Sequence, residues 1–194
     1  LPRTETKTGN KHTDFKVQIN PCLPIEKAAA RRDFTINSMY LDPNSGELID
    51  PFRGRKDLQS NILRHTSAQF TEDPLRVYRA MQFISRFRLI CDSDTLALCQ
   101  SIYGKGQLPK ERIWEEFRKL ILQGKSIQMG LEFLREVGWI KDFPELENLI
   151  DCPQDPQWHP EGDVWTHTLL CLNAFTQRRT GDIEEDLIVG LAIL

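Results

Sequence analysis

The sequence contains no apolar run near the roughly 20 residues that a membrane-spanning helix requires, and its first residues lack the pattern of a secretory signal. We therefore expect no membrane partner. Its five cysteines form no C-x-x-C pair and are odd in number, which argues against a disulfide framework or a zinc knuckle. Reduced thiols of this kind predict a cytoplasmic protein. Internal repeats and low-complexity segments are also lacking, which leaves an ordinary globular organisation.

The composition is that of a soluble protein with a core. The chain has 194 residues, of which 40% are hydrophobic and 27% charged, enough for one sizeable core or two small domains. The net charge of −3 hides an asymmetry, because residues 1–90 carry 15 Lys and Arg against 10 Asp and Glu, and residues 91–194 carry 10 against 18. The N-terminal half is therefore suited to a phosphate-bearing partner. Nothing in these numbers indicates an oligomeric state.

Hydrophobic periodicity predicts a mainly α fold with a small β portion, of the α+β class. Residues 13–64 contain strand-like alternation in "DFKVQI", "DFTINSMYL" and "GELID", with a short helix in "PIEKAAARR". Helices are then expected over 74–88, 94–103, 109–123, 126–137, 163–179 and 183–194. The first residues are polar without capping signals and the last are apolar, so we expect a fragment of a larger protein.

The stretch "RRDFTINSMY" is a candidate binding segment. On a strand, Asp33, Thr35 and Asn37 would share one face while Phe34 and Ile36 enter the core. A row of acid, hydroxyl and amide can bond the hydroxyls of a sugar, and a neighbouring arginine suits a phosphate. The alternative is an exposed polar face on an edge strand.

The stretch "EDPLRVYRA" is the second candidate. Asp73 and Arg76 lie one helical turn apart, and Arg79 continues the stripe. Asp only accepts hydrogen bonds and Arg only donates them, so the pair matches the base edge of cytosine or adenine. Uracil and guanine offer the reversed polarity and would leave groups unpaired, at about 1–3 kcal/mol each. The alternative is that Asp73 and Pro74 simply start a helix.

Together these segments resemble one family. "LPRTETKTGNKHTDFKV", "RRDFTINSMYLDPNSGELIDPFRGRKDL", "ILRHTSAQFTEDPLRVYRAMQF" and "ERIWEEFRKLI" follow one another as in the class II tRNA nucleotidyltransferases and bacterial poly(A) polymerases. The resemblance covers essentially the whole chain. It implies the C-terminal part of a nucleotidyltransferase head domain over 1–64, an all-helical, nucleotide-reading neck over 65–137, and the start of an HD-like helical body over 138–194.

The resemblance also implies roles for single residues. Arg32 and Asp33 would meet the triphosphate and ribose, with Asn37 nearby, and Arg79 would reach the phosphates. Asp73 and Arg76 would form the protein template for the base. A flexible hinge between head and neck is implied for Asp42, Gly46, Asp50 and Gly54. A neck helix that braces the nucleotide pocket is implied for Glu111, Arg112, Glu115 and Lys119. For this second set, the alternative is a solvated helix face.

Metal sites are expected to be incomplete in this chain. Family catalysis resembles two-metal transfer by Mg²⁺ held on an Asp-x-Asp pair, which would precede residue 1. The pair that does occur, Asp92-Ser93-Asp94, is predicted to be a turn and helix cap. In "WHPEGDVWTHTLLCLNAF", His167 matches the first metal-ligand histidine of an HD domain. One histidine does not hold a metal, so we expect His159 and His167 to be ordinary loop and helix residues.

The function that the resemblance implies is template-independent addition of C and A to the tRNA 3′ end from CTP and ATP. The chain alone is expected to bind nucleotide weakly and to catalyse nothing. Three alternatives stay open: a poly(A) polymerase adding only A to RNA 3′ ends, a non-catalytic RNA- or nucleotide-binding module, and an HD phosphohydrolase with a regulatory N-terminal part.

Overall fold

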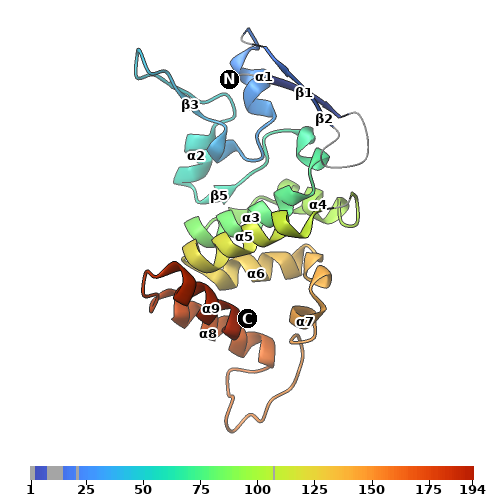
Figure 1. The fold of residues 1–194 in the computed structure, drawn as a ribbon, viewed down its shortest axis with the longest axis vertical. Helices are drawn as coiled ribbons and strands as arrows, with labels where there is room; N and C mark the ends of the chain where they lie inside the picture. The colour runs from blue at the N-terminus through green and yellow to red at the C-terminus, as the bar shows by residue number, and fades with distance from the viewer. Residues whose placement is uncertain (1–2, 8–14, 21, 107) are drawn as a thin grey trace. The chain divides into compact units, whose positions relative to one another are not determined.

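The computed structural model of the chain describes residues 3–7, 15–20, 22–106 and 108–194. It confirms the predicted class, mainly α with a small β portion (Figure 1). Within the described part, no helix has the length and apolarity needed to cross a membrane. Two compact units form, one from residues 1–76 and 90–109, the other from residues 77–89 and 110–194.

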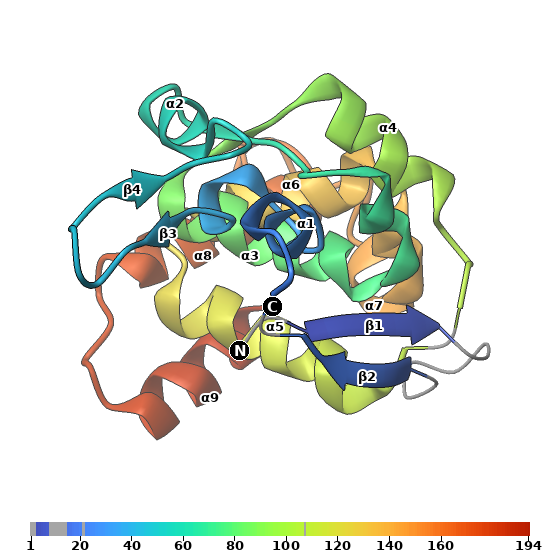
Figure 2. The ribbon, with the colours of Figure 1, turned by 90° about the horizontal axis from the view of Figure 1, so that it is seen from above.

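The first unit contains three small two-stranded sheets and short helices. Strands β1 and β2 are antiparallel and lie side by side (Figure 2), with Arg3 opposite Ile19. Strands β3 and β4 are also antiparallel, whereas β5 and β6 are parallel. The elements are β1 (Arg3–Lys7), β2 (Phe15–Ile19), α1 (Ile25–Ala30), η1 (Thr35–Asn37), β3 (Tyr40–Leu41), β4 (Leu48–Ile49), α2 (Gly54–Gln59), β5 (Ile62–Leu63), η2 (Ala68–Glu72), β6 (Ile90–Cys91) and α4 (Ser93–Ser101).

A small aromatic core holds this unit together. Phe34 and Phe70 are fully buried and their ring centroids lie 5.8 Å apart, in a tilted contact. The ring of His65 lies 6.0 Å from that of Phe70, and Leu63 is fully buried as well. Burial of each such side chain contributes about 1.5–3 kcal/mol, so this core fixes the segments that carry the candidate site.

One strand prediction is wrong. Residues 35–37 form the 3₁₀ turn η1 rather than part of a strand, and the alternation of faces fails with it, because Asp33 and Thr35 are buried alongside Phe34. Local side-chain bonds explain the turn, since the Asn37 amide oxygen accepts from the Phe34 N–H at 3.3 Å. Such bonds offer the backbone an alternative to a sheet ladder.

The second unit is helical, and the six helices predicted over 74–88, 94–103, 109–123, 126–137, 163–179 and 183–194 are all present within a few residues, α4 in the first unit and five here. Helix α3 begins at Leu75 and belongs to this unit from Val77 on. Helices α5 and α9 pack together, as do α6 and α8 (Figure 1). The elements are α3 (Leu75–Phe87), α5 (Lys110–Gln123), α6 (Ile127–Glu136), η3 (Trp139–Asp142), α7 (Pro144–Glu147), α8 (Val164–Thr176) and α9 (Ile183–Ile193).

The core of the second unit is built around Tyr78. Its ring meets Trp139 and Phe143 edge-on, at 5.5 and 6.0 Å between centroids, and its hydroxyl donates to the Asp142 carboxylate at 2.5 Å. At the other end, Gly190 lets α9 approach α5, because a Cβ there would lie 2.4 Å from the side chain of Ile121. The predicted division at residues 64 and 137 stays a prediction, since a compact unit and a domain of a family are different things.

Candidate nucleotide-reading site

The segment that carries Arg32 and Asp33 is fastened to residues 64–67. The Thr66 hydroxyl donates to the carbonyls of Ala30 and Arg32, and the Ser67 hydroxyl donates to that of Ala30. The Thr66 N–H bonds the Asp33 carbonyl at 3.2 Å, and Phe34 and His65 form an isolated antiparallel bridge. Two stretches over 30 residues apart in sequence thus make one rigid support.

On this support, Asp33 and Asn37 face each other across η1. The Asn37 amide donates to the Asp33 carboxylate at 2.8 Å, and Asp33 is only 6% exposed. Arg32 is exposed beside them. The predicted acid and amide are therefore brought together, although by a 3₁₀ turn. A buried carboxylate with a fixed amide partner can accept hydrogen bonds from hydroxyl groups in one orientation.

The structure shows Asp73 as a helix start. Its carboxylate accepts from the Leu75 N–H at 3.1 Å and its carbonyl from the Arg76 N–H at 3.0 Å. The Arg76 guanidinium donates to the carbonyl of Gln69 at 2.7 Å and to that of Arg31 at 2.9 Å. The second bond places Arg76 beside the segment of Arg32 and Asp33, so the two stretches singled out in the sequence meet in one unit.

In the second unit, Arg79 is paired with a residue that the sequence analysis missed. The Glu116 carboxylate lies 3.7 Å from the Arg79 guanidinium and 2.7 Å from the Lys119 ammonium. The Glu116 side chain is 4% exposed, against about a third for its two partners. Its position was readable, because Glu116 interrupts the apolar stripe that Phe117 and Leu120 continue on α5.

The other predicted neck residues divide by exposure. Lys119 makes the ion pair just described, whereas Glu111 and Glu115 point to solvent and Arg112 is half-buried. For Glu111 and Glu115 the exposure agrees with the solvated-face alternative. Their role in bracing a nucleotide pocket stays a prediction.

Of the four predicted hinge residues, Asp42 and Gly46 flank one turn, Asp50 precedes another, and Gly54 is the first residue of α2. Asp42 accepts from the Asn44 N–H at 2.8 Å, a bond that lowers the pKa of the Asp42 carboxyl, and Gly46 has the positive φ of 71° that completes this turn. Asp50 accepts from the N–H groups of Gly54 and Arg55 at the start of α2. Gly54 itself touches η1, since a Cβ there would lie 2.1 Å from the Thr35 carbonyl oxygen.

Asp92 is a helix cap, as predicted, and also part of a partly buried network. Its carboxylate accepts from the Thr95 N–H at 3.4 Å at the start of α4 and pairs with Arg64 at 2.6 Å. Arg64 also contacts Asp57, which accepts from the Thr35 hydroxyl at 2.7 Å. A carboxylate so engaged does not fit the Asp-x-Asp metal pair of a nucleotidyltransferase.

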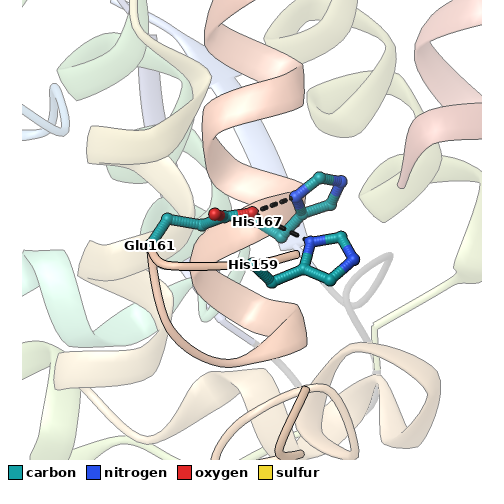
Figure 3. A group of neighbouring side chains, drawn as sticks. All are labelled: His159, Glu161 and His167. Carbon is teal, nitrogen blue, oxygen red and sulfur yellow. Dashed lines mark hydrogen bonds and ion pairs between the residues drawn. The ribbon is translucent and has the colours of Figure 1, made fainter. Parts of the chain in front are cut away.

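A separate cluster lies where the loop before α8 meets that helix (Figure 3). One carboxylate oxygen of Glu161 accepts from Nδ1 of His167 at 2.6 Å and from Nδ1 of His159 at 3.1 Å. These bonds lower the pKa of Glu161 to about 2, and the bond to His167 has the largest effect. The loop geometry brings the two histidines together, and the sequence pattern does not indicate this contact.

Comparison with known proteins defines the class first. Residues 2–64 match the family model described as the poly(A) polymerase head domain. The multifunctional CCA protein of Hahella chejuensis is 42% identical over 179 residues, which is 89% of this chain and 42% of that protein. The chain thus spans less than half the length of the curated relatives it matches.

Solved structures agree. A CCA-adding enzyme in complex with CTP superposes with a TM-score of 0.60 at 25% identity, covering 87% of this chain and 40% of that one. The Thermotoga maritima CCA-adding enzyme complexed with tRNA gives 0.60 at 26% identity, with the same coverages. The chain belongs to the family of class II CCA-adding enzymes and bacterial poly(A) polymerases.

Proposed function

We propose that the whole protein is a template-independent nucleotidyltransferase that adds C and A to the 3′ end of tRNA from CTP and ATP. The observation that carries this is the 42% identity to a multifunctional CCA protein over nearly the whole chain. The solved relatives bound to CTP and to tRNA support both partners. A non-catalytic binding module or a regulatory segment of a phosphohydrolase has no comparable support.

Asp73 and Arg76 are the proposed reader of the base. The carboxylate supplies acceptors and the guanidinium supplies donors, which is the complement of the cytosine and adenine edges. The bond from Arg76 to the Arg31 carbonyl supports this role, because it holds the guanidinium next to the proposed ribose and triphosphate contacts. Arg32, Asp33 and Asn37 are the proposed contacts there.

Capping and reading can be separated at Asp73. Asn is as good a helix cap as Asp, so Asp73→Asn should keep the helix start while replacing one acceptor oxygen by a donor. In the whole protein, with tRNA lacking its terminal residues, we expect Asp73→Asn to lose discrimination of C and A from U and G by at least about tenfold, equivalent to ~1.4 kcal/mol.

The control is Asp73→Ala, which removes both functions and should also lower the melting temperature. Arg76→Lys, which keeps the charge but not the fork of donors, should impair CTP and ATP together. Selection among the four nucleotides that is unchanged in Asp73→Asn and in Arg76→Lys would refute the template role.

The remaining roles follow the same proposal. Arg79 is the proposed phosphate contact, with Glu116 holding its side chain and Lys119 pairing with the same carboxylate. The segment that carries Asp42, Gly46, Asp50 and Gly54 is the proposed hinge. The proposed brace consists of Glu111, Arg112, Glu115 and Lys119.

Mg²⁺ is the proposed metal of the whole enzyme, where it would activate the 3′-hydroxyl and stabilise the triphosphate. Among the described residues, the Asp-x-Asp at 92–94 does not fit this ion, since Asp92 is committed to Arg64 and to the cap of α4. We therefore propose that the magnesium carboxylates lie outside this chain and that the chain alone binds nucleotide weakly without catalysis. Labelled CTP incorporated into RNA by the isolated chain would contradict this.

Addition of A alone is the second candidate, because the matching head-domain model is that of poly(A) polymerases. The two functions differ in CTP use. Purified whole protein that elongates RNA with ATP but never with CTP would be a poly(A) polymerase. The cytoplasm is the proposed location, in keeping with five cysteines of which none is in a disulfide among the described residues.

A further inference from the structure

We propose that one exposed stripe of helix α3, formed by Arg79, Phe83, Arg86 and Phe87, binds unpaired nucleotides of a single-stranded RNA by stacking. Of these side chains, only Arg79 belongs to the proposed nucleotide contacts. The inference rests on the proposed function for the choice of RNA as the polymer, because an enzyme that extends tRNA has to hold its unpaired 3′ end.

This α3 stripe is the side of the helix that the core leaves open. Positions 79, 83 and 86 are partly exposed and position 87 is exposed, whereas residues 80–82, 84 and 85 between them are buried. Side chains three and four residues apart lie on one face of a helix, so the four side chains follow one line along α3. Phe87 is 43% exposed, which makes its ring accessible to a partner.

The rings and guanidinium groups of the α3 stripe are stacked on one another. The rings of Phe83 and Phe87 have centroids 5.7 Å apart and planes 28° apart. The Arg79 guanidinium lies over Phe83, 5.6 Å from its centroid, and the Arg86 guanidinium lies over Phe87 at 5.1 Å. Aromatic faces for bases and arginine donors for phosphates are the two elements of a surface that binds single-stranded nucleic acid.

Both arginines are held in place by side chains of the second unit. The Arg86 guanidinium donates to the amide oxygen of Gln82 at 3.3 Å, and Gln82 is only 2% exposed. The Glu116 carboxylate lies 3.7 Å from the Arg79 guanidinium. The donors of the α3 stripe are therefore ordered before a partner binds, so binding costs little side-chain entropy.

The distribution of charge favours a polyanion as the partner. Helix α3 contains three arginines and no acidic residue, and Arg88 follows it directly. Residues 110–194, in contrast, carry nine Lys and Arg against 16 Asp and Glu. A positive stripe in an otherwise acidic unit attracts phosphates locally, and the forked guanidinium matches phosphate better than an ammonium does.

The aromatic rings favour unpaired nucleotides over a duplex. In a duplex the bases are stacked on one another, whereas unpaired bases can stack on Phe side chains. Stacking of this kind tolerates every base, because each base has a π-face. We therefore expect the α3 stripe to hold about two nucleotides, one for each ring, without sequence preference.

The test is RNA binding by the full 194-residue chain, followed by fluorescence anisotropy without a nucleoside triphosphate. A fluorescein-labelled oligoadenylate should bind, and a blunt-ended RNA hairpin should bind more weakly. Polyglutamate, an acidic polypeptide, should not displace the oligoadenylate. A 2-aminopurine base within the oligonucleotide should lose fluorescence on binding, because it stacks on a phenyl ring.

Variants at Phe87 test the stacking. Phe87→Leu keeps an apolar side chain without a ring and should weaken oligoadenylate binding at least about fivefold, equivalent to ~1 kcal/mol. Phe87→Trp keeps an aromatic face and should retain the affinity. Far-UV circular dichroism should be unchanged in both variants, since this ring is largely outside the core.

A variant at Arg86 tests the phosphate contact. For a single strand, each phosphate contact contributes about 0.7 to the slope of log affinity against log salt. Arg86→Gln should lower the magnitude of that slope by about this amount, whereas Phe87→Leu should leave it unchanged. Arg135→Gln, which removes an exposed arginine from α6, is the charge-matched control and should bind like the unmodified chain.

Three results would overturn the proposal: equal affinity of Phe87→Leu and the unmodified chain, equal losses in Phe87→Leu and Phe87→Trp, or displacement of the RNA by polyglutamate. The last result would assign the α3 stripe to an acidic protein. CCA addition by the whole protein is measured separately. CCA addition together with RNA binding that ignores these variants would refute the stripe alone, whereas variant-sensitive RNA binding without CCA addition would refute the proposed function alone.

Discussion

The ion pair between Glu116 and Lys119 gives the sharpest stability prediction. The Glu116 carboxylate is almost fully buried, with Lys119 at 2.7 Å and Arg79 at 3.7 Å, and its second oxygen has no hydrogen-bond partner among the described residues. Lys119→Gln therefore removes the nearer cation from a buried carboxylate, whereas Glu116→Gln leaves two cations that water can solvate. The two substitutions should be unequal although they break the same contact.

The magnitude follows from exposure. A hydrogen bond to a charged group contributes about 1.5–3 kcal/mol, and the one-third exposure of Lys119 moves the expected loss for Lys119→Gln to about 2 kcal/mol. Glu116→Gln should cost about 1 kcal/mol. Once Glu116 is neutral, Lys119→Gln should cost almost nothing more, so the coupling energy in a double-mutant cycle is about 2 kcal/mol.

Urea denaturation followed by tryptophan fluorescence is the suitable assay, since all four tryptophans lie in residues 110–194 of the second unit. Glu115→Gln, one position earlier and exposed, is the stability control and should change the free energy of unfolding by less than about 0.5 kcal/mol. If Lys119→Gln costs the same in the unmodified chain as in a chain that already carries Glu116→Gln, the reasoning is refuted.

Two further predictions concern the first unit. Gly54→Ala should destabilise it by about 1–3 kcal/mol, because the new Cβ meets the Thr35 carbonyl. In contrast, Gly46→Asn should be tolerated, since that turn has open space and Asn accepts positive φ; similar hydrogen-exchange protection over residues 30–60 in both variants would contradict this. Burial lowers the pKa of His65. The contribution of the neutral His65 ring to the free energy of unfolding should therefore be fully present above about pH 6.5 and be lost as the pH falls below it. His65→Gln should flatten that pH dependence of amide exchange over residues 60–66, and an unchanged slope would exclude His65 as its cause.

Most helices could be predicted because their signals are local. Helix α5 is indicated by the helical spacing of apolar residues over Lys110–Gln123, and the start of α8 is indicated by the capping Asp163. The turn at Thr35–Asn37 could not be predicted, because Asp33, Thr35 and Asn37 have the period of a strand. Tertiary bonds to residues 57 and 64 add to the local bond of Asn37 in selecting the turn.

The candidate site was predictable in composition and not in geometry. The polarity of Asp73 and Arg76 is readable from their chemistry, whereas the bond that places Arg76 against the Arg31 carbonyl depends on a contact 45 residues apart. The same limit applies to His159 and Glu161, whose meeting with His167 depends on how one irregular loop returns to α8.

The fastening of residues 30–37 to residues 64–67 has a thermodynamic consequence. The donors and acceptors of that segment are fixed by bonds within the chain. These bonds come from the hydroxyls of Thr66 and Ser67, the bridge between Phe34 and His65, and the amide of Asn37. A nucleoside triphosphate that binds there would meet groups that are already ordered in the free protein, so binding would cost little additional conformational entropy. Calorimetry across temperature should then give a heat-capacity change set by the surface covered alone, without the larger negative increment that accompanies coupled folding.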